Sequence, residues 1–471
     1  MPSWTSEALC RLRQLNGSAT KYRRLCPRKL YQGKFRPLEV LVEGGRIVAV
    51  EKRVKASSAK VCDASGCLVL PGGVDAHVHF ALPLSGGLRT ADDFFTGGGA
   101  AAAGGITTVI DYTTPRPGEG PLSAFRQRLQ LARKAAAVDF GLHQVLIDWR
   151  PEWEGELRLA QKAGAPSLKV FMIYAERGWQ MVDGKMLELM EVCRRLGLVL
   201  CVHAENDAII EHLTSKELSH PRGAISLARS RPLLAELEAV SRVILFARHS
   251  GCRLHLVHLS TTEAASLVGQ ARKEGLSVSG ETCPQYLLLD EKKLRTDLGH
   301  LYACCPPLRT NKEQEGLWQA LKSGWLQAIT TDHCAFSKDQ KDSWGSDFTR
   351  IPYGLPGVET SLAATFTFGV VARRISQERW AQLHTEGPAR LFGLYPQKGV
   401  IAPGADADLV IWDPEKRWRV EEKRLQSKLG WNPYRGFSFQ GRARQVFLRG
   451  RPIAEEGRFL AGEPLGRFIR R

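Results

Sequence analysis

The sequence predicts an α/β protein: a (β/α)8 TIM-like barrel with a small β-sandwich domain formed by the N- and C-terminal segments. In the middle of the chain, short apolar runs alternate with amphipathic segments of helical periodicity. This is the pattern of parallel βαβ units that close into a barrel. Runs of β-branched residues with glycine turns lie on both sides of that middle, for example at Leu38–Val50, Asp408–Trp412 and Gln445–Ile453. Two β-rich ends around an α/β centre indicate one β domain assembled from both termini.

The barrel strands are expected at the apolar runs, and the helices between them. We expect the strands at Cys67–Leu70 leading to His79, Thr107–Asp111, Phe140–Ile147, Ser167–Ile173, Val199–His203, Leu254–Leu259, Ser277–Thr282 and Gln327–Thr331. Helices are expected, for example, at 122–136, 185–196, 233–249 and 261–273. In such barrels the catalytic groups lie at the C-terminal ends of the strands, so polar residues at those positions carry the functional argument.

The chain divides into three parts on this basis. We expect a basic disordered extension at 1–35, a small β domain at 36–67 plus 396–471, and a (β/α)8 catalytic barrel at 68–395. The first segment is rich in Arg, Ser and Thr with Glu7 as its one acid. An over-extended start or a weak transit-peptide mimic would have the same composition.

Composition argues against nucleic-acid and membrane partners. The hydrophobic content of 43% and charged content of 24% are ordinary for a globular enzyme. The net charge of +17 comes with no aromatic-interleaved basic helix, so we expect no nucleic-acid partner. The apolar runs are too short to span a bilayer, and residues 1–30 lack the apolar core of a secretory signal. The 11 cysteines include no CxxC pair, which indicates reduced thiols and a cytoplasmic location.

Two histidines end the first expected barrel strand. His77 and His79 are one residue apart, so strand alternation puts both imidazoles on one face. Such a pair can bind one divalent metal ion. Taken alone, the motif is a weak signal, and two hydrogen-bonded structural histidines explain it better.

Lys169 lies inside an apolar run in the fourth expected strand. A buried ammonium is costly, so the lysine is either paired or snorkelling, or it is carboxylated on its amine. Carboxylation replaces the positive charge with a carbamate whose two oxygens can bridge two cations.

Three further side chains follow later strands. His203 and His258 end the fifth and sixth strands, and Asp332 ends the eighth. His255 is separated from His258 by an odd number of residues, so we expect it on the opposite face. We expect Glu205 to be a loop carboxylate that supports the site rather than a ligand, and His333 to be structural. Asp332 can bind a metal and accept a proton from a metal-bound water. Together with His77, His79 and Lys169, these side chains would meet at one rim of the barrel.

The motifs resemble the cyclic amidohydrolases, most closely the hydantoinase and dihydropyrimidinase family. They are found at residues 70–79, 91–95, 102–108, 169–174, 202–206, 280–286, 331–334, 388–393, 404–408 and 432–434. The likeness covers nearly the whole chain from about Leu38. The resemblance implies a small cyclic amide or ureide substrate and a homo-oligomer, either a tetramer or a dimer.

The resemblance also implies a metal centre and a mechanism. One zinc ion would be held by His77, His79, Lys169 and Asp332, and a second by Lys169, His203 and His258, so that N6-carboxylated Lys169 bridges the two. A bridging hydroxide would attack the ring carbonyl, Asp332 would carry the proton to the leaving nitrogen, and Tyr174 would steady the developing oxyanion. A hydantoin or dihydropyrimidine ring would open to an N-carbamoyl amino acid.

Departures from the family pattern bear on the substrate. Dihydroorotases and allantoinases usually carry an arginine two residues after the HxH pair, where this chain has Ala81. Cys305 and Tyr353 replace the serine and asparagine found in the family, at positions that resemble those whose backbone binds the cyclic amide. An allantoinase-type ureide hydrolase remains an alternative. A non-catalytic dihydropyrimidinase-related scaffold is a further one, disfavoured because all six ligand positions are filled.

Overall fold

The computed structural model describes residues 21–31, 33–54, 59–84, 87–427 and 429–471. Eight parallel strands form one sheet in the order β13-β12-β11-β10-β9-β8-β7-β6. These strands are β6 Gly73–Val78, β7 Ile106–Tyr112, β8 Asp139–Val145, β9 Ser167–Phe171, β10 Val199–His203, β11 Arg253–Leu256, β12 Val278–Thr282 and β13 Ala328–Ile329. A parallel bridge between Val78 and His333 joins the first strand to the segment after the last. The predicted fold class is therefore confirmed.

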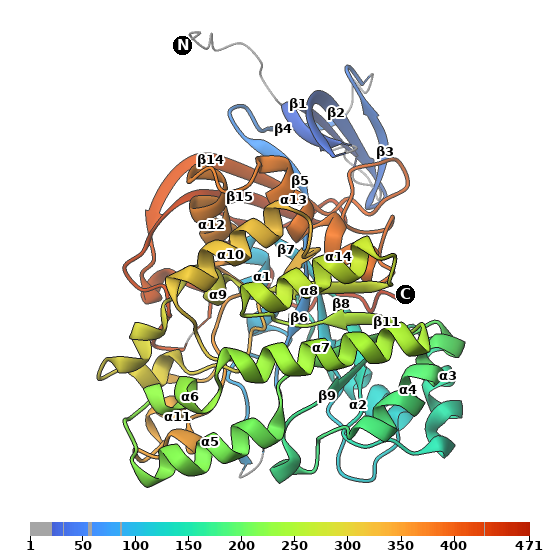
Figure 1. The fold of residues 1–471 in the computed structure, drawn as a ribbon. Helices are drawn as coiled ribbons and strands as arrows, with labels where there is room; N and C mark the ends of the chain where they lie inside the picture. Colours follow the sequence, from blue (N-terminus) through green and yellow to red (C-terminus); the bar gives the residue numbers. More distant parts are fainter. Residues whose placement is uncertain (1–20, 32, 55–58, 85–86, 428) are drawn as a thin grey trace.

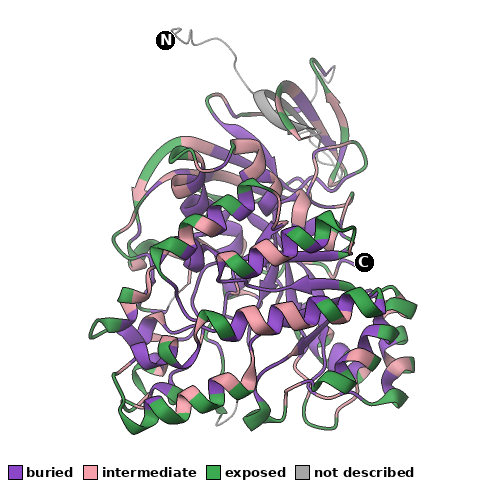
Figure 2. Ribbon diagram, in the orientation of Figure 1, coloured by how far each residue is buried: buried purple, intermediate pink, exposed green. Residues whose placement is uncertain are grey.

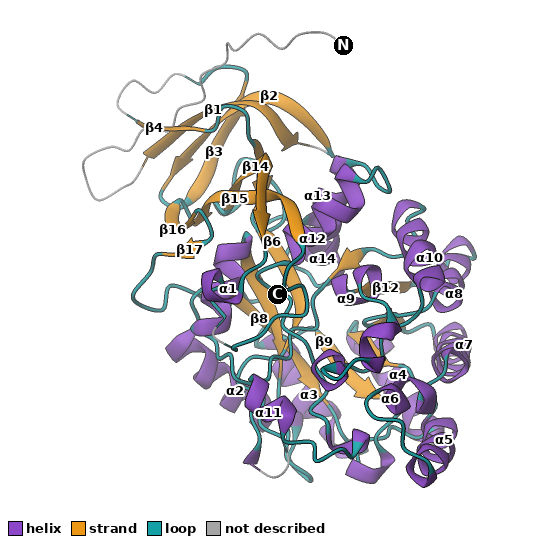
Figure 3. Ribbon diagram, turned by 90° about the vertical axis from the view of Figure 1, so that its left-hand side faces the viewer, coloured by secondary structure: helices purple, strands orange, loops and turns teal. Residues whose placement is uncertain are grey.

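Helices surround this barrel (Figures 1 and 3). The longer ones are α1 Thr96–Gly104, α2 Pro121–Ala135, α3 Glu154–Lys162, α4 Asp183–Leu196, α5 Asp207–Ser219, α7 Leu233–Ser250, α8 Thr262–Lys273, α10 Asn311–Lys322 and α13 Gln377–His384. The shorter ones are α6 Ile225–Ser230, α9 Pro284–Leu288, α11 Lys338–Asp342, α12 Ser361–Thr365 and α14 Glu386–Leu391. β6, β7 and β8 are buried along their whole length, as parallel strands covered on both faces must be. Figure 2 shows this buried centre inside a partly exposed shell of helices.

Both ends of the chain build a second, nine-stranded sheet. Its strands are β1 Lys21–Tyr31, β2 Lys34–Glu43, β3 Arg46–Glu51, β4 Lys60–Asp63, β5 Leu68–Pro71, β14 Leu409–Arg419, β15 Ser438–Leu448, β16 Arg451–Glu455 and β17 Arg458–Phe459. The antiparallel pairing of β5 with β14 joins the N-terminal strands to the C-terminal ones, and Figure 1 shows β5 beside β14 and β15 above the barrel. Residues from both ends also share one hydrophobic cluster, for example Val40, Val69 and Ile411.

Two expectations about the chain ends need correction. Lys21–Tyr31 is a strand paired with β2, so this part of the segment expected to be disordered belongs to the sheet; residues 1–20 lie outside the described residues. At the other end, the last residues leave the β domain and return to the barrel. There the guanidinium of Arg471 donates to the carbonyl of Leu142 and to the hydroxyl of Ser167. The contacts of Arg471 could not be predicted from local composition, because Leu142 and Ser167 are distant from it in sequence.

The first expected barrel strand is two strands. The run Cys67–Leu70 was expected to lead directly to His79, but Leu68–Pro71 forms β5 in the nine-stranded sheet and the barrel strand β6 begins at Gly73. The chain crosses between the sheets at Gly72, where a Cβ atom would lie 2.0 Å from Oγ1 of Thr107. Only glycine fits this approach.

A buried lysine links the barrel to the β domain. The ammonium nitrogen of Lys398 lies 2.5 Å from Asp139, 2.6 Å from Asp408 and 2.9 Å from Asp406. Asp139 begins β8 in the barrel, whereas Asp406 and Asp408 immediately precede β14 of the second sheet. The two sheets therefore share one ion-pair network.

No helix in the described ranges is long and apolar enough to cross a membrane.

Candidate metal centre

The two histidines at the end of β6 converge with the aspartate that follows β13. Nε2 of His77 and Nε2 of His79 each lie 3.1 Å from Oδ1 of Asp332. His77 is buried, whereas 20% of the His79 side chain and 13% of the Asp332 side chain are exposed. The cluster is therefore embedded in the barrel but open to solvent on one side.

His258, His203 and Lys169 complete the cluster from three further strands. One ligand atom from each of His77, His258 and Asp332 lies within 4.8 Å of the others, as in a metal site. The His258 ring centroid is 4.5 Å from that of His203 and 5.3 Å from that of His77. Lys169 precedes the end of β9 by two residues and lies in register with Cys201, two residues before His203. The predicted six residues are thus gathered at the C-terminal ends of the strands.

Several residues of this rim have a left-handed backbone. His258 has a φ of 39°, Asp332 of 49° and Tyr174 of 72°, and Ala81 after the HxH pair has a φ of 47°. Non-glycine residues adopt this region rarely, and such strain concentrates at functional sites. His255 was expected on the face opposite His258. Its ring contacts Glu281, whereas His258 reaches Glu281 through its backbone N–H and its ring lies beside those of His77 and His203.

Glu281 on β12 is a functional candidate that sequence reasoning missed. Its Oε1 is 2.6 Å from Nδ1 of His77, and its Oε2 is 3.1 Å from Nε2 of His255. Burial opposes the ionisation of Glu281, but the two histidines outweigh it and hold the pKa of this carboxyl well below its usual range. Its position near the C-terminal end of a barrel strand could have identified Glu281 from the sequence. Glu281 fixes the His77 ring, as carboxylates behind metal-binding histidines do.

Glu205 plays the same part for His203. Its Oε2 lies 2.7 Å from Nε2 of His203 and 2.7 Å from Nη1 of Arg231. Burial opposes its ionisation, but Arg231 and His203 together lower the pKa of Glu205 to about 2. The carboxylate supports the ring from behind, as expected from the sequence.

The donor set fits divalent cations. Nδ1 of His79 and Nδ1 of His258 are buried and have no hydrogen-bond partner among the described residues. Burial opposes protonation of His77, but Asp332 and Glu281 raise the pKa of His77 to about 9, so a proton neutralises part of the negative charge there. Imidazole nitrogens and carboxylate oxygens converging in this way suit Zn²⁺ and similar ions. A cation would satisfy the orphaned nitrogen of His258 and replace the proton.

Lys169 is a buried lysine with aromatic rings around its ammonium group. No hydrogen bond or ion pair joins its ammonium to any residue in the described part of the chain, and its nitrogen lies 5.5 Å from the Tyr112 ring centroid and 5.4 Å from that of Phe171. Burial lowers the pKa of Lys169 to about 8, with Cys201 and Asp332 opposing that shift. A substantial fraction is then the neutral amine, the form that reacts with CO₂.

Tyr112 was also missed by sequence reasoning. It ends β7, and its ring stacks 4.9 Å from His79 and 4.7 Å from His143. Its buried hydroxyl has no hydrogen-bond partner among the described residues. Nothing in the periodicity of β7 distinguishes this tyrosine from an ordinary core residue.

The remaining predicted residues lie beside the cluster. Tyr174 follows β9, its backbone N–H donates to Asp207 at 2.8 Å, and its ring centroid is 5.6 Å from that of His203. Cys305 and Tyr353 belong to one small hydrophobic cluster. The segments that carry them are joined by the N–H of Gly354, which donates to the carbonyl of Ala303 at 3.0 Å.

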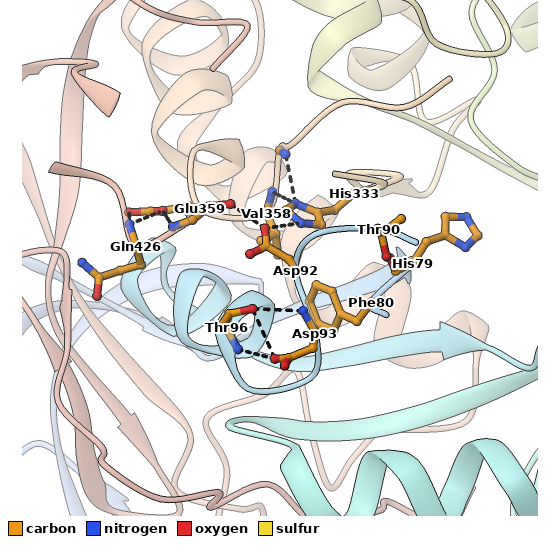
Figure 4. A network of polar contacts seen from close by, with 12 residues as sticks. His79, Phe80, Thr90, Asp92, Asp93, Thr96, His333, Val358, Glu359 and Gln426 are labelled. Carbon is orange, nitrogen blue, oxygen red and sulfur yellow. Dashed lines mark hydrogen bonds and ion pairs between the residues drawn. The ribbon is translucent and has the colours of Figure 1, made fainter. Parts of the chain in front are cut away.

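His333 takes no part in the cluster, as expected. Its Nε2 lies 3.1 Å from Asp92, and its Nδ1 accepts the backbone N–H groups of Gly357 and Val358 at 3.2 and 3.3 Å. Figure 4 shows His333 turned toward Asp92 and Val358, while the His79 ring points away from this network. His333 therefore anchors loops around the rim.

Comparisons with known proteins agree with this geometry. The sequence profile of the amidohydrolase family matches residues 68–453. The chain is 37% identical to a D-hydantoinase of Geobacillus stearothermophilus over 438 residues, which cover 92% of this chain and 93% of the relative. It is 39% identical to a D-phenylhydantoinase of Escherichia coli O81 (strain ED1a), over 87% of this chain and 89% of the relative. The crystal structure of dihydropyrimidinase from Brevibacillus agri NCHU1002 superposes with a TM-score of 0.91 at 35% identity, covering 94% of this chain and 97% of that one.

Proposed function

The chain belongs to the amidohydrolase family and is a cyclic amidohydrolase of the hydantoinase and dihydropyrimidinase type; from this premise we propose that it opens a 5-substituted hydantoin or a dihydropyrimidine to an N-carbamoyl amino acid. The observation that carries the proposal is the convergence of four imidazoles, those of His77, His79, His203 and His258, with the Asp332 carboxylate at the ends of several strands. An unpaired, buried lysine adjoins them.

Two zinc ions are the proposed cofactors. His77, His79, Lys169 and Asp332 would hold one ion, and Lys169, His203 and His258 the other, with N6-carboxylated Lys169 as the shared ligand. The approach of Nε2 of His77 and of His79 to Asp332, the orphaned nitrogen of His258 and the lowered pKa of Lys169 support this assignment. When bound, such ions supply a water that ionises near neutral pH and polarise the ring carbonyl.

Asp332 is the proposed proton carrier. Burial opposes its ionisation, but His77 and His79 hold the pKa of Asp332 well below its usual range, so at neutral pH the carboxylate can accept a proton. Its partial exposure leaves room for it to pass that proton to the leaving ring nitrogen. This is general base and then general acid catalysis by one group.

Tyr174 is the proposed oxyanion donor, and the backbone around Cys305 and Tyr353 would bind the cyclic amide. Burial keeps the pKa of Tyr174 well above its usual value, so its hydroxyl remains a donor throughout the working pH range. One donor aimed at a developing oxyanion is worth roughly 3–4 kcal/mol in the transition state. The Cys305 and Tyr353 side chains would narrow the space around the ring.

A substrate panel tests the activity. Purified protein is supplied with bicarbonate and with zinc or manganese, and is assayed with dihydrouracil, hydantoin, phenylhydantoin, allantoin and dihydroorotate. We expect N-carbamoyl products from the hydantoins or dihydrouracil. Turnover of allantoin alone would favour the ureide hydrolase instead. From the family resemblance we also infer a homotetramer or homodimer, which light scattering measures.

Substitutions at two lysines, Lys169 and Lys185, test the metal centre. Lys169→Ala should lose bound metal and activity together, because it removes the shared ligand. Lys185→Ala, at an exposed lysine of α4, is the matched control and should retain both. Unchanged metal content and full activity in Lys169→Ala would falsify the assignment.

A further inference from the structure

A buried arginine organises the residues proposed to contact substrate. The guanidinium carbon of Arg231 lies 5.9 Å from the Tyr174 ring centroid and 5.7 Å from the Tyr353 ring centroid. Its Nη1 donates to Glu205 at 2.7 Å, and 7% of the Arg231 side chain is exposed. The positive charge of Arg231 is therefore matched by a buried carboxylate, and it places the two tyrosines on either side of one group.

A second arginine at this rim has no such partner. Arg177 ends the one-turn 3-10 helix Ala175–Arg177, directly after Tyr174. Its guanidinium carbon lies 4.7 Å from the Tyr174 ring centroid and 5.6 Å from the Trp179 ring centroid. Within the described part of the chain its ion-pair partner is the adjacent Glu176 at 3.3 Å, whose side chain is 64% exposed. Such a solvated pair contributes little, so the Arg177 charge remains available to a ligand.

The charge of Arg177 acts on the same residues as Arg231. Burial raises the pKa of the Cys305 thiol to about 12, and Arg231 and Arg177 both oppose that rise. Burial likewise raises the pKa of Tyr353 above its usual value, again against Arg231 and Arg177. Arg177 and Arg231 also share a ring contact, because the guanidinium carbons of both lie beside the Tyr174 ring.

Resting on the proposed ring-opening function, we propose that Arg177 makes this enzyme prefer rings whose exocyclic substituent ends in a carboxylate. In the proposed binding mode, the hydantoin or dihydropyrimidine ring contacts the metal centre and the backbone around Cys305. The exocyclic substituent is then the part of the substrate that extends toward Arg177 at the barrel rim. A guanidinium binds a carboxylate by two parallel hydrogen bonds. The aromatic faces of Tyr174 and Trp179 beneath the guanidinium offer apolar contact to the methylene groups that precede the carboxylate.

A matched pair of substrates tests this preference. 5-(2-Carboxyethyl)hydantoin and 5-(2-carbamoylethyl)hydantoin have the same shape and differ in the charge of the substituent. For the metal-loaded wild-type enzyme we expect kcat/KM to favour the acid. In Arg177→Gln the acid-to-amide ratio should fall by roughly ten-fold, the size of one charge-assisted hydrogen bond, with the loss mainly in KM because the contact is equal in ground and transition states.

Controls separate this inference from the proposed function. Arg195→Gln, at an exposed arginine of α4 paired with Glu154, should leave the ratio unchanged. Added salt should lower the wild-type ratio and leave that of Arg177→Gln unaffected, since salt screens exposed charges. Ring opening with equal ratios in wild type and Arg177→Gln would overturn the role of Arg177 alone. Failure of wild type to open either ring with any metal would overturn the proposed function and the inference with it.

Discussion

Lys341 is a buried cation whose removal should stabilise the protein. It lies on α11 with 0% exposure, and its ammonium donates to the carbonyl of Ala303 at 2.8 Å. No ion pair joins it to an acid in the described ranges. Burial lowers the pKa of Lys341 to about 7, against the weak opposing effect of Cys304 and Cys334.

The size of the effect and its pH dependence follow from this pKa. Because the folded-state pKa lies below the unfolded value of 10.5, the charged form is disfavoured in the folded state. The destabilisation is complete below about pH 7, amounting to roughly 5 kcal/mol, and it disappears as the pH rises toward 10.5. Lys341→Met would remove it and lose one hydrogen bond of about 1 kcal/mol. The Ala303 carbonyl keeps its bond from Gly354, so no buried acceptor is orphaned.

We therefore expect Lys341→Met to be more stable than wild type by about 4 kcal/mol at pH 6, with the difference shrinking to zero near pH 10. The assay is denaturant unfolding of the metal-free protein at pH 6, 8 and 10. Lys312→Met, at an exposed lysine of α10, is the control and should show a small, pH-independent change. A variant that is less stable than wild type at every pH would refute the reasoning, because it would mean that the ammonium is compensated in the folded protein.

Three further variants test the interactions described above. Lys398→Met should destabilise the protein by about 3–5 kcal/mol in denaturant unfolding, because it leaves three buried carboxylates without their shared cation; a loss below about 1 kcal/mol would argue against this network. Tyr112→Phe should leave unfolding of the metal-free protein unchanged or stabilise it slightly, since it removes a buried hydroxyl without a described partner, whereas Tyr286→Phe, whose hydroxyl donates to Pro306 at 2.8 Å, should cost about 1 kcal/mol. A marked loss in Tyr112→Phe would show that its hydroxyl is paired. Glu281→Gln should weaken zinc binding about 10–100-fold in competition with a chelator, because His77 loses the carboxylate that orients it; equal affinity would leave Glu281 without a role at the metal centre.

The order of strands and helices followed from the sequence alone. Barrel strands such as Val199–His203 are buried along their whole length and apolar up to the final histidine, because both faces are covered, and the amphipathic helices between them show their periodicity directly. The histidines of the HxH pair, and the histidines and aspartate at later strand ends, could be singled out because a barrel brings all these ends to one rim. The local sequence pattern was sufficient to single out a residue wherever its position at the end of its own strand indicated its function.

The tertiary structure alone decided which groups face each other. Glu281 contacts His77 across 204 residues of sequence, and Arg231 reaches both Tyr174 and Tyr353. Glu281 also contacts the ring of His255 and accepts the backbone N–H of His258. Composition likewise gave no sign that Lys21–Tyr31 would pair with β2. Sequence periodicity reports the face that a side chain takes on its own element, whereas hydrogen bonds and ion pairs depend on distances between elements that only the closed barrel and its neighbouring sheet establish.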